Sequence, residues 1–176
     1  MIKKIGIVAL VLIAGVLAYA ATRSDTFSVA RSISIKAPAE KIYPYMSDFH
    51  KGALWNPYEK RDPAMKRTYS GAASGKGAVC EFEGNKDVGK GRLEIIDAVP
   101  PAHVVLTLDM LSPMKGHNIV EYALEPKGDS TNVTWSMRGK CNYFAKVLGI
   151  FINIDTMVGR DFEAGLENLK ALTEKS

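Results

Sequence analysis

The sequence predicts an α+β domain in which one curved antiparallel sheet of about seven strands wraps around one long C-terminal helix. Three observations support this fold class. Segments of alternating apolar and polar residues recur between residues 26 and 138 and are separated by turn residues. A helical pattern of apolar residues occupies residues 155–174, and an uncharged apolar segment precedes the first strand. The order of these elements indicates one domain, residues 24–176, behind an N-terminal segment, residues 1–23.

The long C-terminal helix is predicted from residue 155 to residue 174. Its apolar residues recur at spacings of four, four, three and three, the period of one helical face: Val158, Phe162, Leu166, Leu169 and Leu172. A helix of this length would extend over roughly 30 Å and could cross a small domain. The preceding segment, 143–152, is also apolar, and Asn153 or Asp155 could cap the main helix. We therefore expect two helical pieces with a break between them.

Seven segments are predicted as β-strands. The first, residues 26–36, alternates apolar residues with serines, which is typical of a strand buried on one face. Glycine- and proline-rich turns separate the six later segments, residues 65–69, 78–83, 89–97, 103–110, 117–125 and 131–138. Strands joined by short turns form hairpins, so these segments predict a single antiparallel sheet. One face of such a sheet needs a cover, which the C-terminal helix is long enough to supply.

Between the first two strands the sequence predicts two short helices and an ordered loop. Ala37-Pro38-Ala39-Glu40 is typical of a helix start, because proline is favoured in the first turn. Pro44 interrupts the apolar residues that follow, which indicates a second short helix or a loop through residues 48–54. The stretch Trp55-Asn56-Pro57-Tyr58 combines a proline with two aromatic side chains that favour burial, so we interpret it as an ordered loop.

The N-terminal segment has the pattern of an export signal. Lys3 and Lys4 precede sixteen uncharged residues, Ile5 to Ala20, and the uncharged stretch reaches eighteen residues at Thr22. Eighteen residues are close to the minimum that spans a bilayer as a helix. Ala18-Tyr19-Ala20 also fits a signal-peptide cleavage site. We expect a membrane anchor, with the domain in the cell envelope on the exported (periplasmic or extracellular) side. The alternative is a secreted domain after signal cleavage.

Charge and cysteine content argue against several classes of function. Three of the basic residues lie in or beside the N-terminal segment, which leaves 20 basic and 19 acidic residues in 24–176. This balance provides no basic stripe for nucleic acid, so we expect no nucleic-acid partner. Cys80 and Cys141 match no zinc-binding or CxxC spacing. They form one disulfide or remain two free thiols, and small buried side chains are the simpler interpretation.

The order of the predicted elements and several short motifs resemble the START-like superfamily, also called SRPBCC, which has the helix-grip fold. The opening TFSVARSISIKAPAEKIYPYMSD (residues 26–48) resembles its first strand and the turn into its first helix. Trp55-Asn56-Pro57-Tyr58 resembles its Trp-x-Pro-aromatic loop, and segments 75–78 and 84–91 resemble its strand-turn-strand signature. Residues 161–170 resemble the end of its last helix. The resemblance covers about residues 26–174 and is strongest to the polyketide cyclase/dehydrase-like branch.

The resemblance implies a cavity between the sheet and the C-terminal helix that binds a hydrophobic small molecule, such as a lipid, a sterol or a polyketide-like compound. It implies no particular reaction, since the superfamily includes both enzymes and binding proteins. We therefore expect a carrier or sensor that needs no cofactor and performs no covalent chemistry. The alternatives are a cyclase/dehydrase-like enzyme acting on a hydrophobic substrate and an interaction module with a filled core.

Large or adaptable apolar side chains on inward faces are the candidate ligand-binding residues. Methionine suits this role because it fills irregular space. The selected residues are Trp55, Tyr58, Met110, Met137, Phe151 and Met157. The alternative is that these side chains fill a dry core. Phe151 and Met157 flank the expected break between the helices, which is where we first expect a bound ligand.

Candidates for catalysis are few. The sequence has no nucleophile elbow, Walker loop, dinucleotide fingerprint or HExxH motif. Asn118 follows His117, and alternation along a strand places one of these two side chains on the inner face of the sheet. This pair is the candidate for an acid or base role near a bound ligand, whereas a surface histidine is the simpler interpretation. We expect no metal site, because the three histidines do not converge with carboxylates in the predicted layout.

Overall fold

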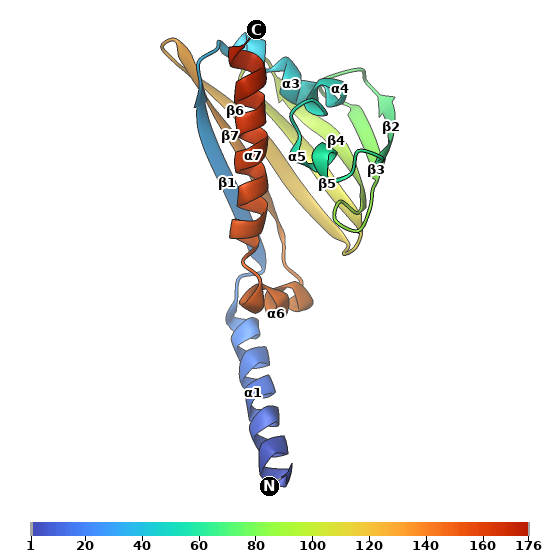
Figure 1. Ribbon diagram of the computed structural model, residues 1–176, viewed down its shortest axis with the longest axis vertical. Helices are drawn as coiled ribbons and strands as arrows, with labels where there is room; N and C mark the ends of the chain where they lie inside the picture. The colour runs from blue at the N-terminus through green and yellow to red at the C-terminus, as the bar shows by residue number, and fades with distance from the viewer. Residues whose placement is uncertain (1, 176) are drawn as a thin grey trace.

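The computed structural model describes residues 2–175. Figure 1 shows a curved sheet held against one long helix, with a second long helix extending away from both. The first half of the chain contains α1 (Ile2–Thr22), β1 (Thr26–Ile35), α2 (Ala39–Ile42), α3 (Pro44–Ser47), α4 (Phe49–Gly52), α5 (Pro57–Arg61), β2 (Lys66–Gly71) and β3 (Ala78–Glu83). The second half contains β4 (Lys90–Val99), β5 (His103–Ser112), β6 (Gly116–Lys127), β7 (Ser130–Lys140), α6 (Tyr143–Phe151) and α7 (Ile154–Glu174).

The seven strands form one antiparallel sheet with the order β1-β7-β6-β5-β4-β3-β2. From β2 to β7 each strand pairs with the next one along the chain. The exception is β1, which pairs with the last strand, from Thr26 opposite Lys140 to Ile35 opposite Thr131. The predicted α+β helix-grip architecture is therefore confirmed.

The strand β4 is irregular at two points. The pairing of β4 with β5 shifts register at Lys90/Gly91 and again at Ile95/Asp97, and such irregularities bend a strand and increase its twist. Gly91 also lies beneath the ring of Phe82 on β3, where a Cβ atom would be 2.8 Å from the Phe82 Cζ atom. A side chain at this position would therefore displace the aromatic ring.

The long helix α7 lies against β1 and β7, as Figure 1 shows. Its buried apolar residues Phe162, Leu166 and Leu169 belong to the predicted helical face, and Val158 and Leu172 extend that face in half-buried positions. The Asn153 side chain accepts a hydrogen bond of 3.0 Å from the Thr156 backbone N–H and caps the helix. The predicted break between two C-terminal helices is thus present, and Asn153 is the cap.

Arg31 interrupts the apolar inner face of β1. Its side chain crosses to α7, where Nη2 lies 3.0 Å from Asp155 Oδ2 and Nε lies 2.7 Å from Glu163 Oε1. A Cβ atom at Gly159 would be 2.0 Å from Arg31 Nη2, so the absence of a side chain at Gly159 lets the guanidinium group pass. These ion pairs fix the first half of α7 along β1.

Four short helices, rather than the predicted two, lie between β1 and β2. The stretch expected to be a loop at residues 55–58 contains the start of α5. There the Asn56 side chain accepts a hydrogen bond of 3.1 Å from the Tyr58 backbone N–H, and Pro57 occupies the first turn. Asparagine at the N-cap followed by proline is favoured at a helix start. This local preference for a helix explains why α5 forms where the aromatic residues indicated an ordered loop.

The helix α1 projects from the domain (Figure 1). Residues Lys4–Thr22 form a helix long and apolar enough to cross a membrane, and almost none of it is buried in the protein. The core helix of a soluble protein would be mostly buried, so α1 is not part of the core. Its last turns contact α6.

Candidate functional site

The middle of the space between the sheet and α7 is filled by aromatic side chains. Trp135 stacks on Phe162 of α7 with ring centroids 4.0 Å apart, and Trp55 and Tyr122 pack against Trp135 at 5.2 Å and 5.5 Å. Gly165 permits this contact, since a Cβ atom there would lie 2.7 Å from Trp135 Cζ3. The part of the grip that holds these four rings is therefore a packed core.

The indole N–H groups of the two tryptophans in this cluster differ in their hydrogen bonding. The Trp55 indole N–H donates a hydrogen bond of 2.8 Å to the Tyr45 carbonyl oxygen. The Trp135 indole N–H is buried and has no hydrogen-bond partner within residues 2–175. Buried donors are nearly always paired. The Trp135 indole N–H is an exception, and it lies at the centre of the fold. Trp55, selected from the sequence as a ligand-binding residue, lies in the core itself.

Residues that pair across neighbouring strands form rows that run across the inner face of the sheet. Trp135 faces α7, so residues that alternate in phase with it line the inner, concave face. One row, called here the Val120 row, consists of Ile95, Leu106, Val120, Met137 and Val29. All of its residues are buried except Met137, which is half-buried. The next row towards α6 is half-buried throughout and is called the Asn118 row: Leu93, Leu108, Asn118, Gly139 and Phe27.

Burial therefore falls along the concave face from the aromatic cluster towards the end of the domain that carries α1 and α6. Met110, one of the selected residues, lies one row beyond Leu108 on β5 and is also half-buried. Met137 forms the last partly open position of the Val120 row. The accessible part of the inner face is thus apolar and contains two of the six residues selected for ligand binding.

Asn118 is the polar exception in its row. Its side chain extends over Gly139 on the neighbouring strand, where a Cβ atom would be 2.0 Å from Asn118 Oδ1. Within residues 2–175 the Asn118 amide has no hydrogen-bond partner. An amide offers both donors and acceptors. It can therefore orient a bound molecule that carries one polar group.

His117 lies on the opposite, convex face of the sheet. Its ring nitrogen Nδ1 is 2.5 Å from Asp109 Oδ1, and both side chains are accessible to solvent. A molecule on the concave face would be separated from this imidazole by the sheet. Of the two candidates for acid–base chemistry, only Asn118 faces inward, and an amide does not ionise near neutral pH, so it cannot serve as a general acid or base.

A buried polar group on α7 lies beside α5. The Asp161 carboxylate accepts a hydrogen bond of 3.1 Å from the Tyr58 hydroxyl and pairs with the Arg61 guanidinium. Burial, and next the charge of Asp161, raise the pKa of Tyr58 above its ordinary value, so this phenol remains neutral. Tyr58 therefore acts in fixing α5 to α7, an arrangement that compensates the buried carboxylate.

The remaining two selected residues are on the outer surface. Phe151 ends α6 and is 72% exposed, and Met157 in the first turn of α7 is 55% exposed. Neither side chain is buried against the concave face. The expected break between the helices is present, but its aromatic and methionine side chains point to solvent.

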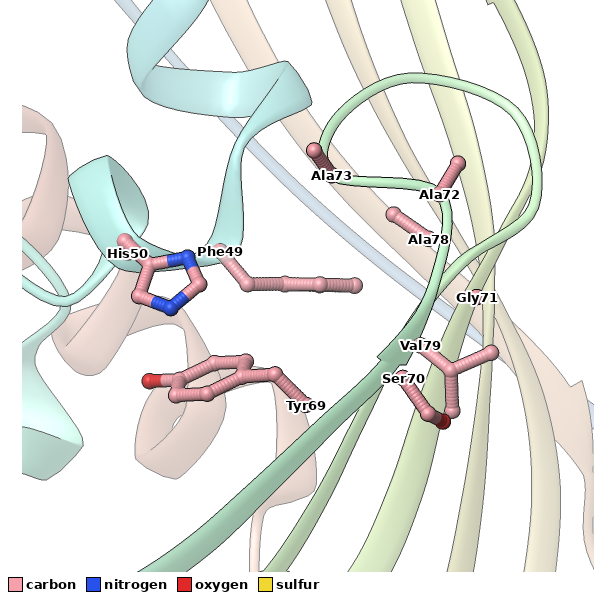
Figure 2. A pocket seen from close by; sticks show the side chains of 9 residues that line it. All are labelled: Phe49, His50, Tyr69, Ser70, Gly71, Ala72, Ala73, Ala78 and Val79. Atoms are coloured by element: carbon pink, nitrogen blue, oxygen red, sulfur yellow. The ribbon is translucent and has the colours of Figure 1, made fainter.

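A cavity of about 240 Å³ lies at the other edge of the sheet, between α4 and the β2–β3 hairpin. Figure 2 shows the His50 ring lying over the Tyr69 ring, with Phe49 pointing towards the hairpin loop at Ala72 and Ala73. This volume is somewhat below that of typical ligand pockets, which start near ~300 Å³. A second, smaller cavity of about 90 Å³ lies where α6 and α7 meet the start of β1.

No cluster of three or more histidine, cysteine, aspartate or glutamate residues with metal-binding geometry occurs in residues 2–175. Cys80 and Cys141 are free thiols. Burial raises the pKa of the Cys80 thiol to about 11, so it is protonated and weakly nucleophilic near neutral pH. Within residues 2–175, Cys80 on the concave face is therefore not an activated nucleophile.

The sheet, its concave face and the helix that grips it define the helix-grip class of proteins. Residues 26–174 match the family described as polyketide cyclase / dehydrase and lipid transport, so the chain belongs to that family, within the SRPBCC superfamily. The family expected from the sequence motifs is therefore confirmed. No curated protein matches the chain.

Solved structures share this fold. Protein CV1439 from Chromobacterium violaceum is 19% identical, with a TM-score of 0.59 over 85% of this chain and 97% of that chain. Protein MLL2253 from Mesorhizobium loti is 15% identical, with a TM-score of 0.63 over 85% and 98%. Ara h 8.0201 is 9% identical, with a TM-score of 0.60 over 86% and 99%. At these identities the likeness concerns the fold alone.

The residues of the Asn118 row other than Asn118 were not selected from the sequence. Leu93, Leu108 and Phe27 look like ordinary core residues, because alternation alone does not distinguish a covered position from an open one. The signal that could have found them is the pairing register. Extending each predicted hairpin from its turn places Leu93, Leu108 and Asn118 side by side.

Proposed function

We propose that this protein is a membrane-anchored binding protein for a hydrophobic small molecule that carries one polar group. The bound molecule lies on the concave face along the Asn118 row, with its apolar part against Leu93, Leu108 and Met110. The Asn118 amide binds its polar group. The observation that carries the proposal is this half-buried apolar row around an unpaired amide. The family description, which includes lipid transport, agrees with it.

The helix α1 supplies the anchor in this proposal. It is apolar over Lys4–Thr22 and almost wholly exposed. Lys3 and Lys4 precede it, and basic residues favour the cytoplasmic side of a membrane. The domain, residues 24–176, is then on the exported side of the cell envelope. A cleaved signal peptide is the competing possibility, and the mass of the mature protein separates the two.

Binding, rather than catalysis, is favoured by the chemistry of the concave face. Among the five residues named in the Asn118 row the only polar side chain is an amide, the next residue of the row on β3 is the buried, protonated Cys80, and His117 is on the other side of the sheet. A cyclase or dehydrase needs a group that gives or takes a proton at the substrate. The proposed site therefore holds its ligand unchanged.

The test compares two aspartate substitutions on neighbouring residues of β5. Leu108→Asp places a charge in the Asn118 row, whereas Thr107→Asp places one on the convex face of the same strand. The protein is purified from membranes in mild detergent, and bound small molecules are identified by mass spectrometry after organic extraction. We expect Leu108→Asp to lose the bound molecule and Thr107→Asp to retain it.

Two results would refute binding at the Asn118 row. The unmodified protein could carry no hydrophobic molecule after this gentle extraction, or Leu108→Asp could retain the same molecule in the same amount. The thermal unfolding midpoint of each variant is measured in parallel, so that loss of the ligand is not confused with loss of the fold.

A further inference from the structure

The helix α6 is apolar yet has no buried residue. Its nine residues, YFAKVLGIF, include one charge; residues 145–150 are half-buried, and none of the nine is fully buried. Tyr143, Phe144 and Phe151 are 48%, 61% and 72% exposed. Ile152, directly after the helix, is also exposed, as is Met157 in the first turn of α7. A soluble protein rarely exposes such a continuous apolar group without a partner.

The position of α6 indicates what covers it. The Tyr143 hydroxyl donates a hydrogen bond of 2.8 Å to the Leu17 carbonyl oxygen in the last turns of α1. Figure 1 shows α6 lying across the end of α1, at the base of the domain. Leu17 and Tyr19 of α1 are exposed beside it. The apolar surface of α6 is thus continuous with that of a helix that is long and apolar enough to cross a membrane.

The one charge on α6 is directed towards the domain. Lys146 pairs with Asp25, and only 9% of its side chain is exposed. No acidic residue occurs from Cys141 to Ile152. The outward face of α6 therefore carries apolar and aromatic groups, while its cation is neutralised beside β1. At the end of α1 the Arg23 guanidinium lies 6.0 Å from the centre of the Tyr19 ring, an arrangement typical of a membrane boundary.

We infer that α6 lies in the interface of the lipid bilayer, with Phe144 and Phe151 inserted among the acyl chains next to α1. The inference rests on the proposed function only in that α1 is the anchor. An apolar helix lying in the plane of the interface inserts one face by ~5–10 Å. Tyr143 then lies at the boundary between head groups and acyl chains, where tyrosine is enriched, with its hydroxyl directed towards Leu17.

Other occupants fit less well. A helix of nine residues is roughly 14 Å long, which is short for a protein interface that buries about 800 Å² per partner. Folding of α6 over the concave face would break the contacts of Tyr143 with Leu17 and of Lys146 with Asp25. The bilayer, in contrast, is already next to α6 if α1 crosses it.

This placement brings the Asn118 row close to the membrane surface. Gly139, a member of that row, precedes the Asn142 cap of α6 by three residues, which span about 10 Å in extended chain. Phe27, at the other end of the row, follows α1 by five residues. A hydrophobic molecule could then pass between the bilayer and the concave face over a short distance.

The experiment uses the full chain in two sets of phosphatidylcholine vesicles, one with bromine on the acyl chains near the head groups and one with bromine near the chain ends, because bromine quenches nearby tryptophan. The native Trp55 and Trp135 are 3% and 5% exposed and give the baseline. Phe151→Trp reports on α6 through the bromine near the head groups, and Leu12→Trp, in the middle of α1, reports on α1 through the bromine near the chain ends. Leu54→Trp is the control, an exposed site between α4 and α5 away from the base of the domain.

For Phe151→Trp we expect a blue-shifted emission and quenching of roughly half of the added fluorescence, as suits a ring ~5–10 Å deep in the interface. For Leu54→Trp we expect no added quenching. If Leu12→Trp is quenched and Phe151→Trp is not, the placement of α6 is wrong while the anchor stands. If Leu12→Trp is not quenched, the anchor is wrong, and quenching of Phe151→Trp would then support interfacial binding by α6 alone.

Discussion

At the scale of single residues, glycines leave the space in which large side chains pack against each other. Gly165 on α7 lies where Trp135, Pro57 and Trp55 converge, with Cβ distances of 2.7, 3.1 and 3.4 Å. The rings are held by stacking on Phe162 and by the hydrogen bond of Trp55. They therefore have little freedom to move aside.

We predict that Gly165→Ala destabilises the protein. Overpacking of the rigid aromatic cluster costs ~1–3 kcal/mol, and the better helix propensity of alanine returns up to ~1 kcal/mol. The middle of each range gives a net loss of unfolding free energy of about 1–2 kcal/mol, measured by denaturation in detergent with tryptophan fluorescence. Gly149→Ala on α6 is the matched control, because nothing lies within 4 Å of its Cβ position. Equal effects of the two substitutions would disprove the packing argument.

Arg31 makes the stability of the domain depend on pH. Its hydrogen bonds hold the pKa of Asp155 below the ordinary value of an aspartate. A carboxylate whose pKa is lower in the folded state stabilises the fold above its unfolded pKa, near ~4, and this contribution is lost as pH falls through the folded pKa.

We therefore expect Arg31→Met to lower the melting temperature at pH 7. The difference between variant and unmodified protein should narrow as pH falls below ~4, where Asp155 becomes protonated in the unmodified protein. Thermal unfolding at a series of pH values measures this. A difference that stays constant from pH 7 to pH 3 would show that the ion pairs contribute nothing and that only packing of the side chain matters.

At the scale of elements, α1 and α7 are both helices of 21 residues, but they have opposite surroundings. α7 is amphipathic and buries one face against the sheet. α1 is apolar on all sides and buries almost none of its surface. A helix of the second kind suits a lipid environment, which is the role proposed for it.

A charge in the middle of α1 tests that role. An arginine at the centre of a membrane-spanning helix costs ~2.5–3.5 kcal/mol, whereas near the end it reaches the head groups. We expect Ile13→Arg to shift the protein from the membrane pellet to the supernatant after carbonate extraction. Thr22→Arg, at the end of the same helix, should leave it in the pellet. Retention of both variants in the pellet would contradict the anchor.

Much of this architecture follows from the sequence, and the exceptions have physical causes. The strands and α7 were predictable because apolar periodicity records which face of an element is buried. The helix α5 was missed because a cap of two residues, Asn56 and Pro57, determined its start. Alternation placed Met110 and Met137 on the inner face, as the strand register does. It did not show that Trp55 is buried or that Phe151 is exposed. The burial of a side chain depends on which elements pack over it, and these are distant in the sequence.

At the scale of the whole molecule, burial decreases along the concave face towards the end that carries α1. The strand β7 samples this gradient within one element, from the buried Thr131 and Val133 to the half-buried Met137 and Gly139. Local opening requires less free energy where fewer apolar groups are buried. The two ends of the same strand should therefore differ in their dynamics.

Hydrogen exchange of the full chain measures this difference. We expect the amides of residues 131–135 to exchange more slowly than those of residues 137–140. A bound molecule on the Asn118 row should slow exchange in the second group and leave the first unchanged, because it covers only the open end. Uniform protection along β7, with or without ligand, would argue against an open end to the concave face.

The pairing of β1 with β7 has a further consequence for biosynthesis. The strand β1 is among the first parts of the domain to leave the ribosome, but its only partner in the sheet is the last strand made. At ~5–20 residues per second, the roughly one hundred residues between them take about 5–20 s to synthesise. During that interval the residues of β1 lack the strand with which they pair. Completion of the sheet therefore waits for the synthesis of its final strand.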